Sequence, residues 1–184
     1  MKTDPIQHYI LKNEYNLNIA STVADAWIEA RGKLVAGFLD RLDSRLKKKL
    51  KGWRSELYGG SFFVDAYPGF YVSKPTWKHH SIGFQCGEHG DRMTIGIARD
   101  TADSRKLPRY APLLTAVQSI LPAARSQAWW EARAAMRSPA PDWRKPDVLW
   151  RMHTDNEFVK DVAEQLLEIA RVGEPILDRL YRRK

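Results

Sequence analysis

Residues 61–100 read SFFVDAYPGFYVSKPTWKHHSIGFQCGEHGDRMTIGIARD and carry most of the β-strand signal of the chain. Short apolar and aromatic runs alternate there with turn residues. They predict strands at 62–67, 69–74, 81–86 and 92–98, with turns at Tyr67-Pro68-Gly69 and at 87–91. Alternate positions of the last two strands place large apolar side chains on one face: Ile82, Phe84, Cys86, Met93, Ile95 and Ile97. We therefore expect a four-stranded antiparallel meander with one buried face.

The opposite face of this meander carries small residues, among them Gly83, Gly96 and Ala98. Small side chains either allow another group to approach the sheet closely or are ordinary sheet residues that mark a bend. Both interpretations remain open at this stage.

Helical patterns flank the sheet on both sides. Apolar residues recur every three or four positions over 21–53 and predict a long helix, which follows an N-terminal arm at 1–20. Further helices are predicted at 111–121, 123–137, 154–173 and 176–181, with a capping box at the start of the third and Gly173 at its end. Residues 142–152 look irregular or weakly strand-like. The chain is thus expected to be one α+β domain, 1–184, whose C-terminal helical part (111–184) packs on one face of the sheet.

The overall charge points to an acidic partner. The 184 residues carry a formal net charge of +8, which favours nucleic acid, an anionic membrane or an acidic protein surface. Cys86 is the one cysteine, so no intrachain disulfide is possible, and its apolar strand suggests a buried side chain rather than a nucleophile. The first ten residues do not resemble a signal peptide, and no apolar run approaches the length of a membrane span. These features predict a soluble, cytoplasmic protein without a membrane partner.

A basic cluster at the end of the long helix is the clearest functional signal. Its members are Arg45, Lys47, Lys48, Lys49, Lys51 and Arg54. We expect these cations to contact phosphates, with Trp53 or Tyr58 stacking on bases. The alternative is a solvated helix end, whose positive charge the helix dipole favours.

Loop tryptophans supply a second candidate surface. Trp77, followed by Lys78, His79 and His80, lies between two predicted strands and is a candidate interface anchor. Trp129 and Trp130 are candidates as well. Packing inside the protein is the alternative for all three rings.

Catalytic motifs are absent from the sequence. There is no glycine-rich dinucleotide or phosphate loop, no cysteine pair for zinc, no HExxH and no GxSxG. A metal site near His79 and His80 would draw on Glu88, His89 and Asp91, but ordinary polar loop residues explain that pattern better. Asp65 is not followed by the (Asp/Glu)-x-Lys triplet that a metal-dependent nuclease would need. We therefore predict no catalytic residue, no metal and no cofactor.

The segment 69–100, together with the preceding helix, resembles an accessory domain that follows the nuclease module in bacterial PD-(D/E)XK-family proteins. The matching elements are Trp77, Ile82-Gly83-Phe84 and Ile95-Gly96-Ile97, with Trp143, Trp150 and the 158–169 helix as further matches. The catalytic elements of the family are missing here. The resemblance therefore implies an accessory role in nucleic-acid processing or in bacterial or phage defence.

Three functions follow as hypotheses. The first is a non-enzymatic basic protein that binds nucleic acid or a nucleic-acid-bound protein complex. The second is a phage-type inhibitor that covers an acidic surface of a host defence protein. The third is a metal-dependent nuclease that uses residues from among His79, His80, Glu88, Asp91 and Asp65. The oligomeric state is left open.

Overall fold

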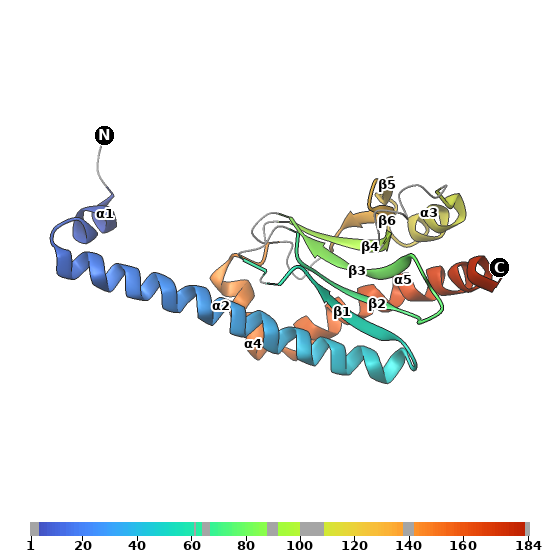
Figure 1. Ribbon diagram of the computed structural model, residues 1–184, viewed down its shortest axis with the longest axis horizontal. Helices are drawn as coiled ribbons and strands as arrows, with labels where there is room; N and C mark the ends of the chain where they lie inside the picture. Colours follow the sequence, from blue (N-terminus) through green and yellow to red (C-terminus); the bar gives the residue numbers. More distant parts are fainter. Residues whose placement is uncertain are drawn as a thin grey trace.

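The computed structural model describes residues 4–60, 62–63, 67–87, 92–99, 109–137 and 142–182 (Figure 1). In these residues a six-stranded antiparallel sheet has the order β1-β2-β3-β4-β6-β5. The strands are β1 (Arg54–Tyr58), β2 (Gly69–Ser73), β3 (His80–Cys86), β4 (Met93–Arg99), β5 (Arg125–Gln127) and β6 (Trp130–Ala135). The helices are α1 (Pro5–Ile10), α2 (Glu14–Lys49), α3 (Ala111–Gln118), α4 (Pro146–Thr154) and α5 (Asn156–Arg182). The predicted α+β class is confirmed.

The sheet has six strands rather than the four predicted. Strands β2, β3 and β4 lie where they were expected, but the predicted first strand at 62–67 is wrong. Phe62 and Phe63 are buried in a turn, and 64–66 lie outside the described residues. The strand beside β2 is instead β1, because Gly52 adopts a φ of 80° after α2 and sends the chain straight back into the sheet.

The predicted helix at 123–137 is also wrong, since this segment forms the β5–β6 hairpin. Alanines are good helix formers, but here Ala132 and Ala134 alternate with Arg133 across the strand and pair with Ile97 and Ile95 of β4. Both alanines are buried. Burial beside β4 therefore overrides the local helix propensity.

Three helix boundaries differ from the predictions. Helix α2 begins at Glu14, where the side chain of Asn13 caps it, and not at residue 21. Residues predicted to be irregular form α4, which has proline in its first turn. Helix α5 runs through Gly173 and Pro175 without a break. Gly173 is retained inside this helix because a Cβ there would come within 2.9 Å of Ile97 Cδ1 on the sheet.

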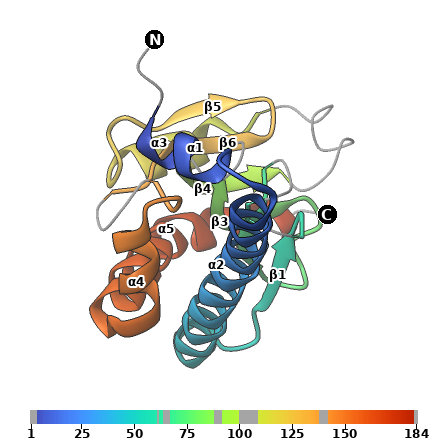
Figure 2. The same cartoon turned by 90° about the vertical axis from the view of Figure 1, so that its left-hand side faces the viewer.

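Helices cover one face of the sheet, which we call the inner face. Helix α5 contacts β3 and β4, α3 contacts β6, and α2 packs against α4 and α5 (Figure 2). An aromatic cluster lies at the centre, where Trp143 is 5.3 Å from Phe38 and from Phe84, and 5.4 Å from Phe62, between ring centroids. All six apolar side chains predicted to share this face are buried. Of the predicted C-terminal helical part, α3 and α5 contact the sheet, α4 packs on α2 and α5, and 125–135 joins the sheet itself.

A buried charged group joins the sheet to the end of α5. Glu131 Oε1 lies 3.3 Å from His80 Nε2 and 3.4 Å from Arg99 Nε, and its Oε2 accepts the backbone N–H of Tyr110 at 3.1 Å. His80 Nδ1 is 2.7 Å from the hydroxyl of Tyr181 on α5. Burial acts to raise the pKa of Glu131, but the bonds from His80 and Tyr110 and the charge of Arg99 outweigh it, so the pKa is lowered.

Candidate binding site on the outer face of the sheet

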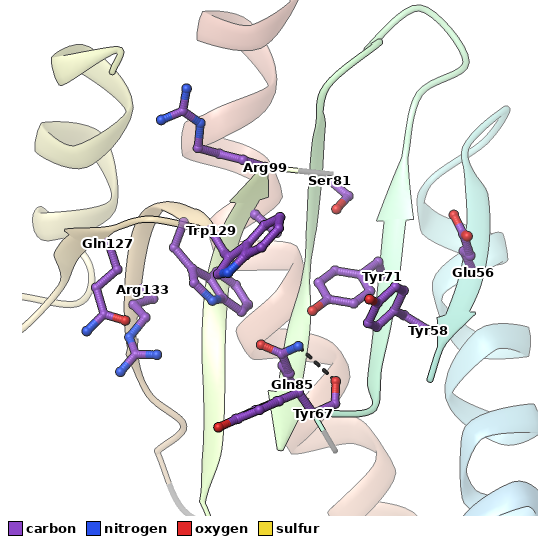
Figure 3. A pocket seen from close by; sticks show the side chains of 12 residues that line it. Glu56, Tyr58, Tyr67, Tyr71, Ser81, Gln85, Arg99, Gln127, Trp129 and Arg133 are labelled. Atoms are coloured by element: carbon purple, nitrogen blue, oxygen red, sulfur yellow. Dashed lines mark hydrogen bonds between the residues drawn. The ribbon is translucent and has the colours of Figure 1, made fainter. Parts of the chain in front are cut away.

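The other face, which we call the outer face, contains a hollow of about 590 Å³ (Figure 3). Its lining includes five aromatic residues from four separate parts of the chain: Tyr58, Tyr67, Tyr71, Trp129 and Trp130. Three of these are substantially open to solvent, with exposures of 58% for Tyr58, 49% for Tyr67 and 46% for Trp129. The hollow has the size of typical small-ligand sites, and its rings are accessible to a flat partner.

Small residues lie at the floor of the hollow, where Ser81 and Ala98 line it and Gly69 and Gly83 lie beneath the ring of Tyr71. Tyr71 lies across this floor, because a Cβ on Gly83 would come within 2.4 Å of Tyr71 Cδ1 and one on Gly69 within 2.7 Å of Tyr71 Cε2. The close approach that the small residues permit is therefore made by a ring of the same chain. Gly69 serves this packing, and its φ is not positive, contrary to the turn conformation predicted for it.

Tyr67 has an unusual backbone at the rim of the hollow. Its φ is 59°, the left-handed region that non-glycine residues rarely adopt. The side-chain amide of Gln85, also in the lining, donates to the carbonyl oxygen of Tyr67 at 2.8 Å (Figure 3). Strained backbone of this kind is found preferentially at binding and catalytic sites. Here it accompanies the exposed Tyr67 ring at the hollow.

Two arginines on neighbouring strands give one side of the outer face a positive charge. Arg125 of β5 is paired directly with Arg133 of β6, and Arg133 lines the hollow. Burial, and secondarily the charge of Arg125, lower the pKa of Arg133, which nonetheless stays protonated at neutral pH. Like charges opposite each other on a sheet repel. An anion bound between them would relieve this repulsion.

The predicted basic helix end leads directly into β1, the strand at the opposite edge of the sheet. Arg54 occupies the same side of β1 as Glu56 and Tyr58, since strand residues alternate and both of the latter line the hollow. Arg45, Lys48, Lys49 and Lys51 are exposed at or just beyond the end of α2. Lys47 is also exposed but lies 2.6 Å from Asp43 in an ion pair. Most of the predicted cations are therefore available to an anionic partner.

Unlike the lysines, the two tryptophans predicted to contact a partner, Trp53 and Trp77, are not exposed on the surface. Trp53 is half-buried, and its ring meets that of Trp77 edge-on with 4.7 Å between centroids. Trp77 is only 4% exposed, and its indole N–H donates to Asp178 at 2.9 Å. Both rings therefore contribute to packing, which was the alternative interpretation for Trp77.

The rest of the predicted loop interface is split between surface and interior. His80 is buried in the charged group with Glu131, and His79 is half-buried and donates its backbone N–H to Tyr181 at 3.0 Å. Lys78 is exposed. Thus the burial of Trp77 and His80 removes two of the four expected contacts from the surface.

The residues considered for metal binding lie mostly outside the described part of the chain. Glu88, His89, Asp91 and Asp65 are in the segments 64–66 and 88–91, which are not described. Among the described residues, no group of three or more His, Cys, Asp or Glu side chains is arranged to hold a metal ion. Nor do these residues contain a helix that is both long and apolar enough to cross a membrane.

Some of the outer-face residues were predicted from the sequence, but not that they meet in one hollow. Tyr58 and Trp129 were candidates for stacking and for an interface, whereas Tyr67, Tyr71 and Arg133 were not singled out. An alternating pattern in 125–135 would have indicated a strand that presents Arg133, but the alanines favoured a helix. The grouping depends on pairing between β1 and β2 and between β4 and β6, which local patterns do not specify.

Comparison of the chain with protein-family models, with curated proteins and with solved structures finds no match. The resemblance to a PD-(D/E)XK accessory domain is therefore neither supported nor contradicted by these comparisons and remains a prediction.

Proposed function

We propose that the outer face of the sheet binds single-stranded nucleic acid. Bases stack on the exposed rings, and the phosphates contact arginines and lysines at the two edges of the face. The observation that carries this proposal is the hollow itself, in which Tyr58, Tyr67 and Trp129 are open to solvent around a common space. Base–aromatic stacking contributes about 1–3 kcal/mol per base and tolerates any sequence.

The charge distribution supports an anionic partner. Arg125 and Arg133 lie at one edge and Arg54 at the other, where the exposed lysines at the end of α2 immediately precede it in the chain. A strand that crosses the hollow would therefore have phosphate partners before and after the stacked bases. The net charge of +8 adds a long-range attraction that weakens as salt is added.

Single strands are favoured over duplexes because base faces must be free to reach the rings. In a duplex these faces are stacked on one another, and only the edges of the bases are accessible in the grooves. Glu56 and Gln127 in the lining offer hydrogen-bonding groups to the edges of unpaired bases. The proposed activity is binding alone, without a chemical step.

A fluorescence titration tests the proposal. Labelled single-stranded and double-stranded DNA and RNA are titrated with the full chain at two salt concentrations, with and without Mg²⁺, and the strands are then analysed on a denaturing gel. We expect salt-sensitive binding with preference for single strands, which remain intact. No binding at low salt, or equal affinity for duplexes, would overturn the proposal, and cut strands would support the nuclease hypothesis instead.

Matched variants locate the contact. The double variant Y58A/W129A removes two exposed rings, and W150A removes a ring that is 63% exposed on α4 and not part of the hollow's lining. We expect the double variant to lose at least tenfold in affinity and the control to bind like wild type. A third variant, with Lys47, Lys48 and Lys49 changed to Glu, tests the helix end. Loss of binding in this variant alone would move the site from the outer face to α2.

A further inference from the structure

Helix α1 and the first half of α2 extend away from the sheet and its helices (Figures 1 and 2). We call residues 4–34 the N-terminal arm. Within it, the side-chain amide of Asn16 donates to the carbonyl oxygen of Tyr9 at 2.7 Å and fastens α1 to α2. The arm holds nine of the fourteen large hydrophobic side chains that are exposed in the described residues: Ile6, Tyr9, Leu11, Tyr15, Leu17, Ile19, Val23, Trp27 and Ile28.

The apolar surface of the arm is too wide for a solvated helix. The polar residues of this part of α2 recur every three or four positions and form one stripe: Glu14, Asn18, Ser21, Asp25, Glu29 and Lys33. Most of the remaining circumference is apolar or alanine, well beyond the arc of about 100° that a surface helix normally buries. Further along the same helix, Phe38, Leu42 and Leu46 are fully packed in the core. Apart from Leu34 and Arg31 at its base, which contact the core and Phe63, the arm has the composition of a packed helix but leaves its large apolar side chains exposed among the described residues.

Local propensity does not explain the helical arm. Residues 13–23 contain three asparagines, a serine, a threonine, an isoleucine and a valine, all of which are weak helix formers. In proteins most of the stability of a helix comes from tertiary packing of its apolar side rather than from propensity. A partner that covers the arm would supply this packing.

The charge of the arm identifies the class of partner. Residues 1–34 contain four basic and four acidic residues: Lys2, Lys12, Arg31, Lys33, Asp4, Glu14, Asp25 and Glu29. The whole net charge of +8 therefore resides in 35–184, and the arm has no electrostatic preference for phosphates. Helices that lie on membranes are usually rich in lysine and arginine on the polar side, whereas this polar stripe has three acidic residues and one lysine.

We propose that the arm binds the arm of a second copy, with the two arms antiparallel about a two-fold axis. Ile19, Val23 and Trp27 lie on the side of the helix opposite the polar stripe, so the apolar sides of the two arms face each other. The nine side chains, three of them aromatic, expose on the order of 800 Å², the area that one partner contributes to a standard protein interface. This inference is independent of nucleic-acid binding by the outer face.

Sedimentation of the full chain over a wide concentration range tests the proposal. We expect a concentration-dependent species of twice 21.2 kDa, and helical circular dichroism that falls when the dimer is diluted. The variant I19D/V23D should be monomeric at every concentration while its near-ultraviolet spectrum shows a folded body. The control W150D replaces an exposed ring of α4 by a negatively charged side chain and should dimerise like wild type. A wild-type chain that stays monomeric, or a dimer unaffected by I19D/V23D, would overturn the proposal.

Discussion

The two faces of the sheet are built from alternate residues of the same strands, yet they have different roles. On β3 the inner positions hold Ile82, Phe84 and Cys86, all fully buried beneath the helices. The outer positions hold Ser81, Gly83 and Gln85, which form part of the floor of the hollow or support its rings. The inner face consists of large interlocking side chains, whereas the outer face combines small floor residues with aromatic rings from the edges.

This difference separates stability from binding. Burial of the inner side chains supplies most of the favourable free energy of folding, since that energy is proportional to the apolar area removed from water. The exposed rings of the outer face contribute little to folding and remain available to a ligand. Substitutions on the inner face should therefore change mainly the free energy of unfolding, whereas substitutions on the outer face should change mainly the affinity for the ligand.

The largest effect is expected for F84A on the inner face. Phe84 is fully buried against Phe70 and Trp143, so its removal leaves a cavity and should lower the free energy of unfolding by about 3–5 kcal/mol. Chemical denaturation measures this loss. The neighbouring variant Q85A, on the outer face, removes one hydrogen bond to Tyr67 and should cost about 1 kcal/mol. Equal losses for the two variants would contradict the assignment of faces.

The second largest loss in the free energy of unfolding is expected for E131Q, which replaces the buried Glu131. It removes the negative charge that faces Arg99 and should cost about 3 kcal/mol at neutral pH, as is usual when a buried ion pair is broken. The lowered pKa of Glu131 adds a pH dependence. Its stabilising contribution is present above the ordinary value of 4.5 and is lost as the pH falls through the lowered value in the folded protein.

The difference in stability between wild type and E131Q should therefore shrink as the solution is acidified. Denaturant titrations at a series of pH values from neutral to acid measure this difference. If it stays constant over the whole range, the carboxylate of Glu131 is not the group that stabilises the cluster.

A smaller loss is expected for G83A on the floor of the hollow. The new Cβ would meet the ring and the Cα of Tyr71, so the chain must shift, at a cost of about 2 kcal/mol. The displaced ring should also weaken nucleic-acid binding. Gly37 is the control, because it lies in α2 with open space around it, and G37A should stabilise the protein by about 0.5–1 kcal/mol. Unfolding midpoints that move in the same direction for both variants would contradict the close packing at Gly83.

The smallest change in stability is expected for Y58A. Tyr58 is exposed at the edge of the sheet, so the free energy of unfolding should change by less than about 0.5 kcal/mol. Its loss of affinity for single strands should be larger, about 1 kcal/mol or more, since one stacking partner is removed. Parallel denaturation and titration experiments compare the two quantities. If Y58A lowers the free energy of unfolding but leaves the affinity for single strands unchanged, the roles assigned to the two faces are wrong.

Part of this architecture could be predicted because it is written in local patterns. The alternation in 81–86 and 93–98 correctly assigned β3 and β4 and the side chains of the inner face, since a period of two leaves one consistent arrangement. The apolar stripe of α2 could also be recognised from the spacing of its residues in the sequence. The candidate site was predicted only in fragments, because its rings come from β1, β2, a loop and a hairpin that are distant in sequence.

The failures share one physical cause. Local propensity favoured a helix at 123–137 and helix ends at Gly173 and Pro175, but pairing of β6 with β4 determined the first outcome and packing of α5 against the sheet the second. In the same way, the loop position of Trp77 suggested a surface ring, whereas Asp178 of α5 holds it inside. Such contacts between distant segments contribute more free energy than the small preferences of single residues.

The sequence by itself determined the class of the fold, the strands at its centre, the apolar face that they bury and the excess of positive charge. Hydrophobic periodicity and composition are sufficient for these, because each depends only on residues near one another in the chain. The tertiary structure decided the number of strands, the pairing of β1 with β2 and of β4 with β6, and therefore the aromatic hollow. Those features depend on which distant segments meet, and that is decided by the packing of the whole domain.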